Sequence, residues 1–149
     1  MTKNRQKRWK MTNLCYLIAA IILVESSGDN RALGDYKNGE PKAFGPMQIQ
    51  NVCREDVNRF ARTQFTRNDC FSRGKSIQMF RLYIGYYATE DRLGRAPTLE
   101  DYSRIWNGGP TGWRKPSTLD YWEKVKLELW MPHKEALAKY EEVTDGKSI

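Results

Sequence analysis

The chain has 149 residues, of which 40% are hydrophobic and 12% aromatic, enough for the core of one domain. This composition excludes a chain that is disordered throughout. The 25 lysine and arginine residues outnumber the 18 acidic residues, and the formal net charge of +7 favours an anionic partner or surface. The predicted organisation is a basic arm over residues 1–13, a main domain over residues 14–130, and a peripheral helix and tail over residues 131–149.

The first strong element is an apolar run that extends from Leu14 to Val24 and is followed by Glu25. Its spacing predicts a helix buried nearly all round, with Asn13 as N-cap and Gly28 as the stop. A basic start before an apolar run is also typical of a secretory signal peptide, but no clear small-residue cleavage site follows. The run is too short to span a bilayer, so we expect a core helix and no membrane span.

Glu25 is a candidate general acid because the predicted helix leaves the core at this residue. Apolar packing disfavours the charged carboxylate and raises its pKa, as an acid that works near neutral pH requires. The alternative is that Glu25 is only the first solvated residue after a buried helix.

The remaining segments alternate turns with helices. Asn38-Gly39 predicts the turn of a loop or short hairpin within residues 29–44. Thr98 and Asp101 resemble a capping box at the start of a short helix. Because little of the chain alternates as strands do, the predicted fold is mainly α, with helices over residues 54–65, 72–90, 98–107 and, from Thr118, 118–130.

The three cysteines leave one question open. Cys15 is predicted to be a small core residue, whereas Cys53 and Cys70 are candidates for a disulfide in an oxidising compartment. Spacing alone does not establish the geometry that a disulfide needs. His133 is the only histidine and lies far from the cysteines, so no metal site and no cofactor are predicted.

Polar and aromatic groups gather at predicted helix ends and turns in the segments VESSG (24–28), GPMQI (45–49), RIWNGG (104–109) and YWEKV (121–125). Each segment alone is a weak signal, because turns favour such residues for backbone reasons. With SIQMF (76–80), their order resembles the lysozyme-like lytic transglycosylases and their relatives the goose-type lysozymes. The resemblance covers about residues 14–125. Pro46, Phe80 and Trp106 depart from the family pattern, but none of them removes a group that the reaction requires.

This resemblance implies a lysozyme-like α+β fold with a substrate cleft. It implies that Glu25 protonates the β-glycosidic bond between N-acetylmuramic acid and N-acetylglucosamine in peptidoglycan. The substrate-binding residues carried over are Ser26, Met47, Gln48, Trp106, Asn107 and Tyr121, with Met47 packed beneath its turn and Trp113 as a further sugar face. Two alternatives stay open: Ser26 only bonds the local backbone, and Tyr121 is a core residue.

The resemblance leaves two reactions open. A lytic transglycosylase, the first expectation, uses one acid, and a hydroxyl of the muramic acid attacks to give an anhydro product. An inverting, goose-type hydrolase needs a second carboxylate to activate water. Asp35, in the pair Gly34-Asp35, is the candidate for that role, and Asp29 competes with it.

The expected partner is the glycan strand of the bacterial wall, met by a monomer in the periplasm, outside the cell or after delivery by a phage. A further alternative is a non-catalytic basic module that holds nucleic acid through the arm at residues 3–10. No recognisable nucleic-acid motif supports it, so no nucleic-acid partner is expected.

Overall fold

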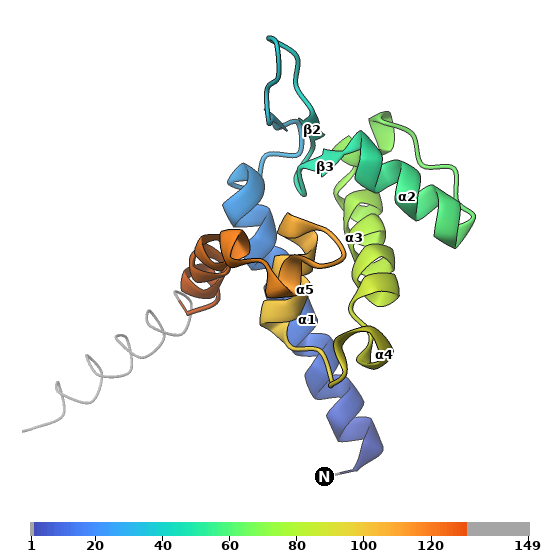
Figure 1. The fold of residues 1–149 in the computed structure, drawn as a ribbon, viewed down its shortest axis with the longest axis vertical. Helices are drawn as coiled ribbons and strands as arrows, with labels where there is room; N and C mark the ends of the chain where they lie inside the picture. Colours follow the sequence, from blue (N-terminus) through green and yellow to red (C-terminus); the bar gives the residue numbers. More distant parts are fainter. Residues whose placement is uncertain (1, 131–149) are drawn as a thin grey trace, which may run out of the picture.

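The computed structural model describes residues 2–130, and this part of the chain is mainly helical with a small sheet, as predicted (Figure 1). In chain order the main elements are α1 (Lys3–Ser26), β1 (Leu33–Gly34), β2 (Ala43–Phe44), β3 (Ile49–Gln50), α2 (Asn51–Ala61), α3 (Arg73–Tyr87), α4 (Glu90–Leu93) and α5 (Leu99–Gly108). Residues 119–130 are also helical. Short 3₁₀ turns occupy Asn68–Phe71, Gly112–Arg114 and Pro116–Thr118.

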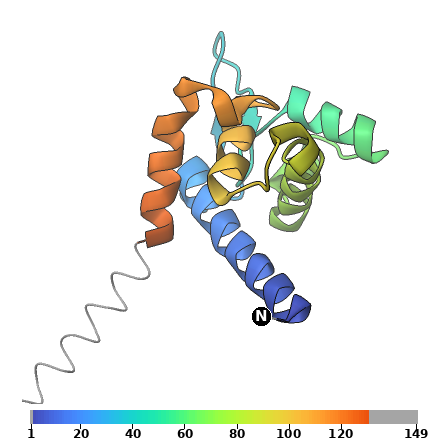
Figure 2. The same ribbon diagram turned by 60° about the horizontal axis from the view of Figure 1, so that its bottom comes forward.

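The core forms where α5 packs against both α1 and α3 (Figures 1 and 2). One stripe of α1 supplies Leu17, Ile18, Ile21 and Ile22, all nearly inaccessible to solvent. These residues recur at the three- and four-residue spacing of one helical face, so the packing follows the sequence pattern. The helix that carries Glu25 is therefore anchored along the half nearest that residue.

Helix α1 differs from its prediction at both ends and on one face. It begins at Lys3, so Asn13 lies within the helix and is not its N-cap. It ends at Ser26, and the left-handed residue Ser27 caps it in place of Gly28. The prediction that the helix is buried nearly all round is wrong, because Cys15 and Leu23 are exposed. An evenly apolar run does not specify which of its faces the rest of the chain covers.

The sheet is a small antiparallel meander in the order β1–β2–β3. Beyond β1 and β2, Lys37 pairs with Glu40 around Asn38 and Gly39, which both have positive φ, at 54° and 80°. Two positive φ values in a two-residue loop are typical of the tight turn that Asn-Gly favours. The predicted hairpin turn is confirmed, and Figures 1 and 2 show the hairpin projecting from the body of the molecule.

Of the two caps predicted for the later helices, that of Thr98 is present and that of Thr118 is not. The capping box of Thr98 and Asp101 is present, and Asp101 also accepts hydrogen bonds from Arg95. The helix predicted over residues 72–90 is two helices, because the chain leaves helical geometry at Ala88 and α4 starts anew. Thr118 does not cap as expected: its hydroxyl is buried, 2.8 Å from the carbonyl oxygen of Gly112.

The three cysteines are free thiols. Cys15 is exposed, so its expected core position is wrong, whereas burial raises the pKa of Cys53 to about 12 and that of Cys70 to about 11. Within residues 2–130 no helix is long and apolar enough to cross a membrane, and no three acidic, cysteine or histidine side chains are grouped to hold a metal. His133 and the predicted helix and tail over residues 131–149 lie outside the described residues.

The fold predicts a difference between two glycines of similar backbone geometry. Gly39 and Gly45 have φ of 80° and 77°. A Cβ at Gly39 meets nothing within 4 Å, whereas a Cβ at Gly45 would lie 1.8 Å from the carbonyl oxygen of Cys70. We expect Gly39→Ala to lower the free energy of unfolding by about 1 kcal/mol and Gly45→Ala by about 3 kcal/mol or more. Urea unfolding followed by circular dichroism measures both, and equal losses would contradict the close packing at Gly45.

Candidate active site

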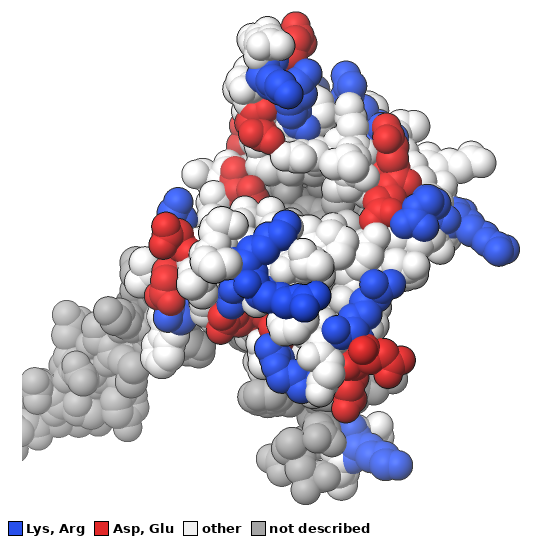
Figure 3. Space-filling model, viewed as in Figure 1, with Lys and Arg blue, Asp and Glu red and all other residues white. Residues whose placement is uncertain are grey.

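A cavity of about 1070 Å³ opens between the hairpin, α2 and α5. In Figure 3 this face is hollowed below the hairpin, and Lys and Arg side chains gather on the α5 side of the hollow. The cavity is lined by five of the eight site residues predicted from the sequence, Glu25, Asp35, Gln48, Trp106 and Asn107. Ser26, Met47 and Tyr121 are not among its lining residues.

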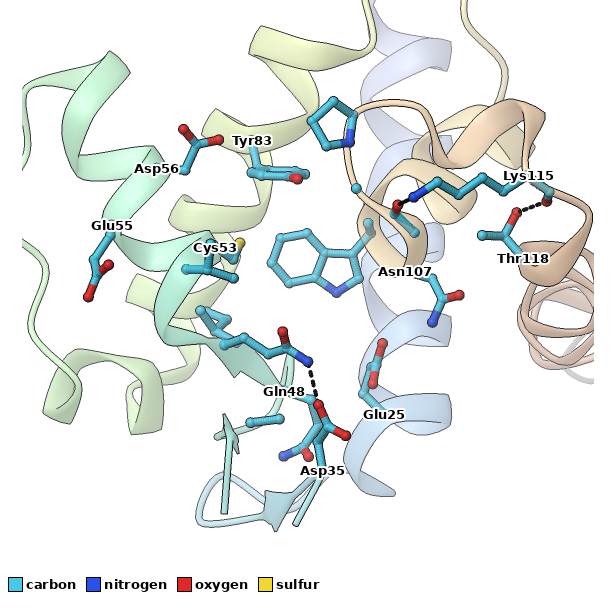
Figure 4. Close-up of a pocket in the computed structure, with 18 of the residues that line it drawn as sticks. Glu25, Asp35, Gln48, Cys53, Glu55, Asp56, Tyr83, Asn107, Lys115 and Thr118 are labelled. Carbon is cyan, nitrogen blue, oxygen red and sulfur yellow. Dashed lines mark hydrogen bonds between the residues drawn. The ribbon is translucent and has the colours of Figure 1, made fainter. Parts of the chain in front are cut away.

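Glu25 lies in the last turn of α1, where the helix reaches the cavity (Figure 4). Burial raises its pKa from 4.5 to about 7, although a hydrogen bond from Tyr121 opposes the rise. The Tyr121 hydroxyl donates to Glu25 Oε1 over 2.7 Å. The C-terminal end of a helix also disfavours negative charge, and no basic residue lies in this last turn to offset it. The carboxyl is therefore able to carry a proton near neutral pH.

Asp35 lies on the hairpin and lines the same cavity as Glu25 (Figure 4). Its φ of 53° places it in the left-handed region, and its carboxylate accepts a hydrogen bond from Gln50 Nε2. Asp29, the competing candidate, does not line the cavity and accepts from the backbone N–H of Arg31. The structure thus brings one further predicted carboxylate to the cavity, and it is Asp35.

Gln48 has a strained backbone, and its side-chain amide makes hydrogen bonds within the protein. It has a positive φ of 49° at the turn that joins β2 to β3. Its amide nitrogen donates to the carbonyl oxygens of Gly45, at 3.0 Å, and Ala32, at 3.3 Å. A Cβ on Gly34 would lie 2.1 Å from its Oε1, so the amide also packs closely on the hairpin. Gln48 therefore ties the hairpin to the turn, and its donors are not free for a ligand.

The α5 side of the cavity combines an aromatic ring with an amide. Trp106 is partly buried, and its ring meets the rings of Phe80 and Tyr83 edge to face, with centroids 5.1 and 5.7 Å away. The exposed Asn107 follows it at the end of α5, and Figure 4 shows its amide near Glu25. Phe80 thus contributes to the cavity by packing against Trp106.

Three residues that were expected to contact the substrate do not line the cavity. The Ser26 hydroxyl lies 3.0 Å from the carbonyl oxygens of both Ile22 and Pro46, so it links α1 to the turn before β3. Met47 is fully buried in the core and has no surface to offer a substrate. Trp113 does not line the cavity, and the guanidinium groups of Arg114 and Arg95 lie over its ring, 5.0 and 5.9 Å from the centroid. These three residues are close to site residues in the sequence, but their side chains stabilise the local structure and do not line the cavity.

The sequence analysis missed the α2 side of the cavity and one lysine. Asp56 accepts a hydrogen bond from the Tyr87 hydroxyl and pairs with Arg59, and both Asp56 and Arg59 line the cavity. In the sequence these charges were indistinguishable from the solvated face of a helix. Lys115 also lines the cavity, where its ammonium donates to the carbonyl oxygen of Gly108. No local pattern in the sequence sets it apart from the other lysines.

No protein-family model matches the chain, but individual proteins do. The chain is 39% identical over 109 residues to a lysozyme of Ostrea edulis, which spans 73% of this chain and 76% of that protein. It is 73% identical over 98 residues to a lysozyme of Magallana gigas, covering 64% of this chain and 66% of that protein.

Two solved structures share the fold. The lysozyme of Tapes japonica matches with a TM-score of 0.60 and the inhibitor-bound lysozyme of Meretrix lusoria with 0.61. Each is 24% identical and covers 74% of this chain and 85% of the other. The lysozyme-like fold expected from the motifs is therefore confirmed. The expected delivery by a phage finds no support in these relatives, which come from bivalves. From its similarity to the Ostrea edulis protein, the chain belongs to the lysozyme family and is an enzyme that cleaves glycosidic bonds.

Proposed function

We propose that the enzyme hydrolyses the β-glycosidic bond between N-acetylmuramic acid and N-acetylglucosamine in the peptidoglycan of bacterial walls. The observation that carries this proposal is the pair of carboxyl groups in one cavity, Glu25 at the end of α1 and Asp35 on the hairpin. Glycoside hydrolases use two such groups on either side of the bond that is cut. The relatives from Ostrea edulis and Magallana gigas are also named lysozymes.

Glu25 acts as the general acid in this proposal. With a pKa of about 7 it keeps its proton in neutral solution and donates it to the glycosidic oxygen as the bond breaks. Tyr121 is a positioning residue, because its hydroxyl holds Glu25 Oε1 and it does not line the cavity. Asp35 is exposed to water at the same cavity and activates the water that attacks the sugar.

The other lining residues supply sugar binding. Trp106 offers an aromatic face on which a pyranose ring packs. Phe80 and Tyr83 hold the Trp106 indole in place through edge-to-face contacts. Asn107 has an amide that both donates and accepts hydrogen bonds, as an N-acetyl group requires. The cavity of about 1070 Å³ is slightly larger than most small-molecule sites, which leaves room for several sugar units.

A lytic transglycosylase is the alternative that the motifs suggested first. In that reaction Glu25 serves as acid and then as base, a hydroxyl of the muramic acid attacks, and Asp35 is not needed. We favour hydrolysis because Asp35 lies at the cavity and because the relatives named above are lysozymes. Membership of an enzyme family also argues against the non-catalytic basic module. The net charge of +7 suits a wall rich in carboxylates and phosphates.

Purified protein incubated with peptidoglycan tests the reaction. We expect products with reducing ends, identified by mass spectrometry. Glu25→Gln should lower the rate by about 100-fold or more because it removes the acid, and Asp35→Asn should lower it by about tenfold or more. Asp29→Asn is the matched control, since Asp29 lies in the same loop but outside the cavity, and its rate should stay within about twofold.

Two outcomes would contradict parts of this account. Anhydro products, together with an active Asp35→Asn variant, would assign the enzyme to the transglycosylases. Full activity of Glu25→Gln would overturn the enzymatic role of this cavity altogether.

Tyr121→Phe should move the pH dependence of the reaction. The rate should fall as the pH rises through about 7, because the acid then loses its proton. The hydrogen bond from Tyr121 lowers the pKa of Glu25, so its removal should shift the falling limb to higher pH. Profiles of kcat/KM against pH measure this shift. Tyr36→Phe, at an exposed residue of the hairpin, is the control, and a limb that shifts equally in both variants would refute the coupling.

The same pKa predicts how stability depends on pH without any substrate. Between pH 4.5 and 7 the folded protein holds the Glu25 proton while the unfolded chain has released it, so stability falls as the pH rises through this window. The scale is about 1.4 kcal/mol for each unit of pKa difference. Glu25→Gln should therefore gain stability relative to the parent between pH 4.5 and pH 8. A stability difference that stays constant in urea unfolding across that range would contradict the raised pKa.

A further inference from the structure

Lys115 places a positive charge on the α5 side of the cavity, close to the residues proposed to bind sugar. Its Nζ donates to the carbonyl oxygen of Gly108 over 2.6 Å, at the C-terminal end of α5. Gly108 follows Asn107 directly, and Figure 4 shows the lysine chain extending along this wall toward the helix end. A cation is favoured at the negative end of a helix, so the ammonium is well placed there in the free protein.

The base of Lys115 is held by a network of hydrogen bonds. Arg104 donates from Nη2 to the carbonyl oxygen of Lys115 over 3.1 Å. The same guanidinium is fixed by Glu100, at 2.8 Å, and by the buried hydroxyl of Thr118, also at 2.8 Å. The lysine stem runs beside Gly108, where an added Cβ would lie 3.6 Å from Lys115 Cδ. The backbone of Lys115 is therefore held in place, and its side chain extends from there along the α5 side of the cavity.

The charge of Lys115 is not neutralised by the protein. Of the two basic residues that line the cavity, Arg59 is paired with Asp56. Within residues 2–130 no carboxylate lies within ion-pair distance of Lys115, and its only hydrogen-bond acceptor there is a neutral carbonyl. The cavity's four carboxyl groups lie on α1, the hairpin and α2, and none of them pairs with Lys115. The α5 side is therefore suited to an anionic part of a ligand.

We propose that Lys115 binds a carboxylate carried by the glycan, and that it makes the cavity prefer chains with anionic sugars over neutral chains of N-acetylglucosamine. This inference rests on the proposed function and adds the residue that selects the substrate. In peptidoglycan the carboxylate has two sources, the lactyl group of muramic acid where it is unsubstituted and the peptide attached to it where it is not. Both present the same chemistry to an ammonium.

Binding measurements separate this role from general charge effects. Isothermal titration calorimetry in a Glu25→Gln background, in which cleavage is slowed, compares three tetrasaccharides. One is neutral chitotetraose, one alternates N-acetylglucosamine with free muramic acid, and one carries peptides on its muramic acids. The variants are Lys115→Gln and the control Lys124→Gln, which removes the same charge from an exposed lysine outside the cavity.

Lys115→Gln should weaken binding of the anionic chains by about three- to tenfold more than binding of chitotetraose, the range expected of a solvent-accessible charged hydrogen bond. This extra loss should shrink at high salt. If the loss occurs with the free muramic chain, the lactyl carboxylate is the ligand, and if only with the peptide-bearing chain, the peptide is. Lys124→Gln should show no such difference.

Equal losses for neutral and anionic chains, or no loss for either, would overturn the assignment of Lys115 while leaving the proposed function in place. If none of the three tetrasaccharides binds the Glu25→Gln protein, the proposed function fails and this inference fails with it.

Discussion

The removal of the Glu25 carboxyl from water is the constraint on which the site depends. Burial raises its pKa to about 7, and its position at the C-terminal end of α1 acts in the same direction. A single hydrogen bond from Tyr121, in the helix over residues 119–130, joins this carboxyl to the far end of the described chain. That bond lowers the pKa of Glu25, whereas burial raises it, and the balance of the two effects leaves the pKa at about 7.

Much of the surrounding structure serves to hold backbone near this carboxyl. Ser26 links the end of α1 to Pro46, and Gly45 donates its N–H to Ala32 on the other side of the hairpin. Gln48 adds its amide to the same junction. Asp35 and Gln48, both on the cavity, have left-handed backbones that cost free energy in residues other than glycine. Backbone strain of this kind is tolerated where close packing, such as that between Gly34 and the Gln48 side chain, fixes the conformation of the chain.

The sequence predicts best those features whose cause is local. The Asn38-Gly39 turn and the capping box of Thr98 and Asp101 depend on a few neighbouring residues, and both are present. The raised pKa of Glu25 followed from an apolar run ending in one acid. The exposed face of α1 was not predictable, because Leu14 to Val24 is apolar all round and only tertiary packing decides which side is covered.

The lining of the cavity was predictable at the candidate residues that reach it, such as Asp35, Trp106 and Asn107. The motifs failed to predict the lining at two other residues. The Ser26 hydroxyl bonds to the backbone, and Met47 is buried in the core. Asp56 and Lys115 show the converse, since they reach the cavity through the packing of α2 and of the turn after α5. Such residues carry no signal in a single sequence because the fold, and not their neighbours, brings them there.

Direct titration of Glu25 tests the central claim most closely. Carbon-13 NMR of the carboxyl carbons in uniformly labelled protein, with Glu25→Gln to assign the signal, follows this one group across the pH range. The account predicts a midpoint near 7 for Glu25, and a midpoint near the ordinary value of 4.5 would contradict it.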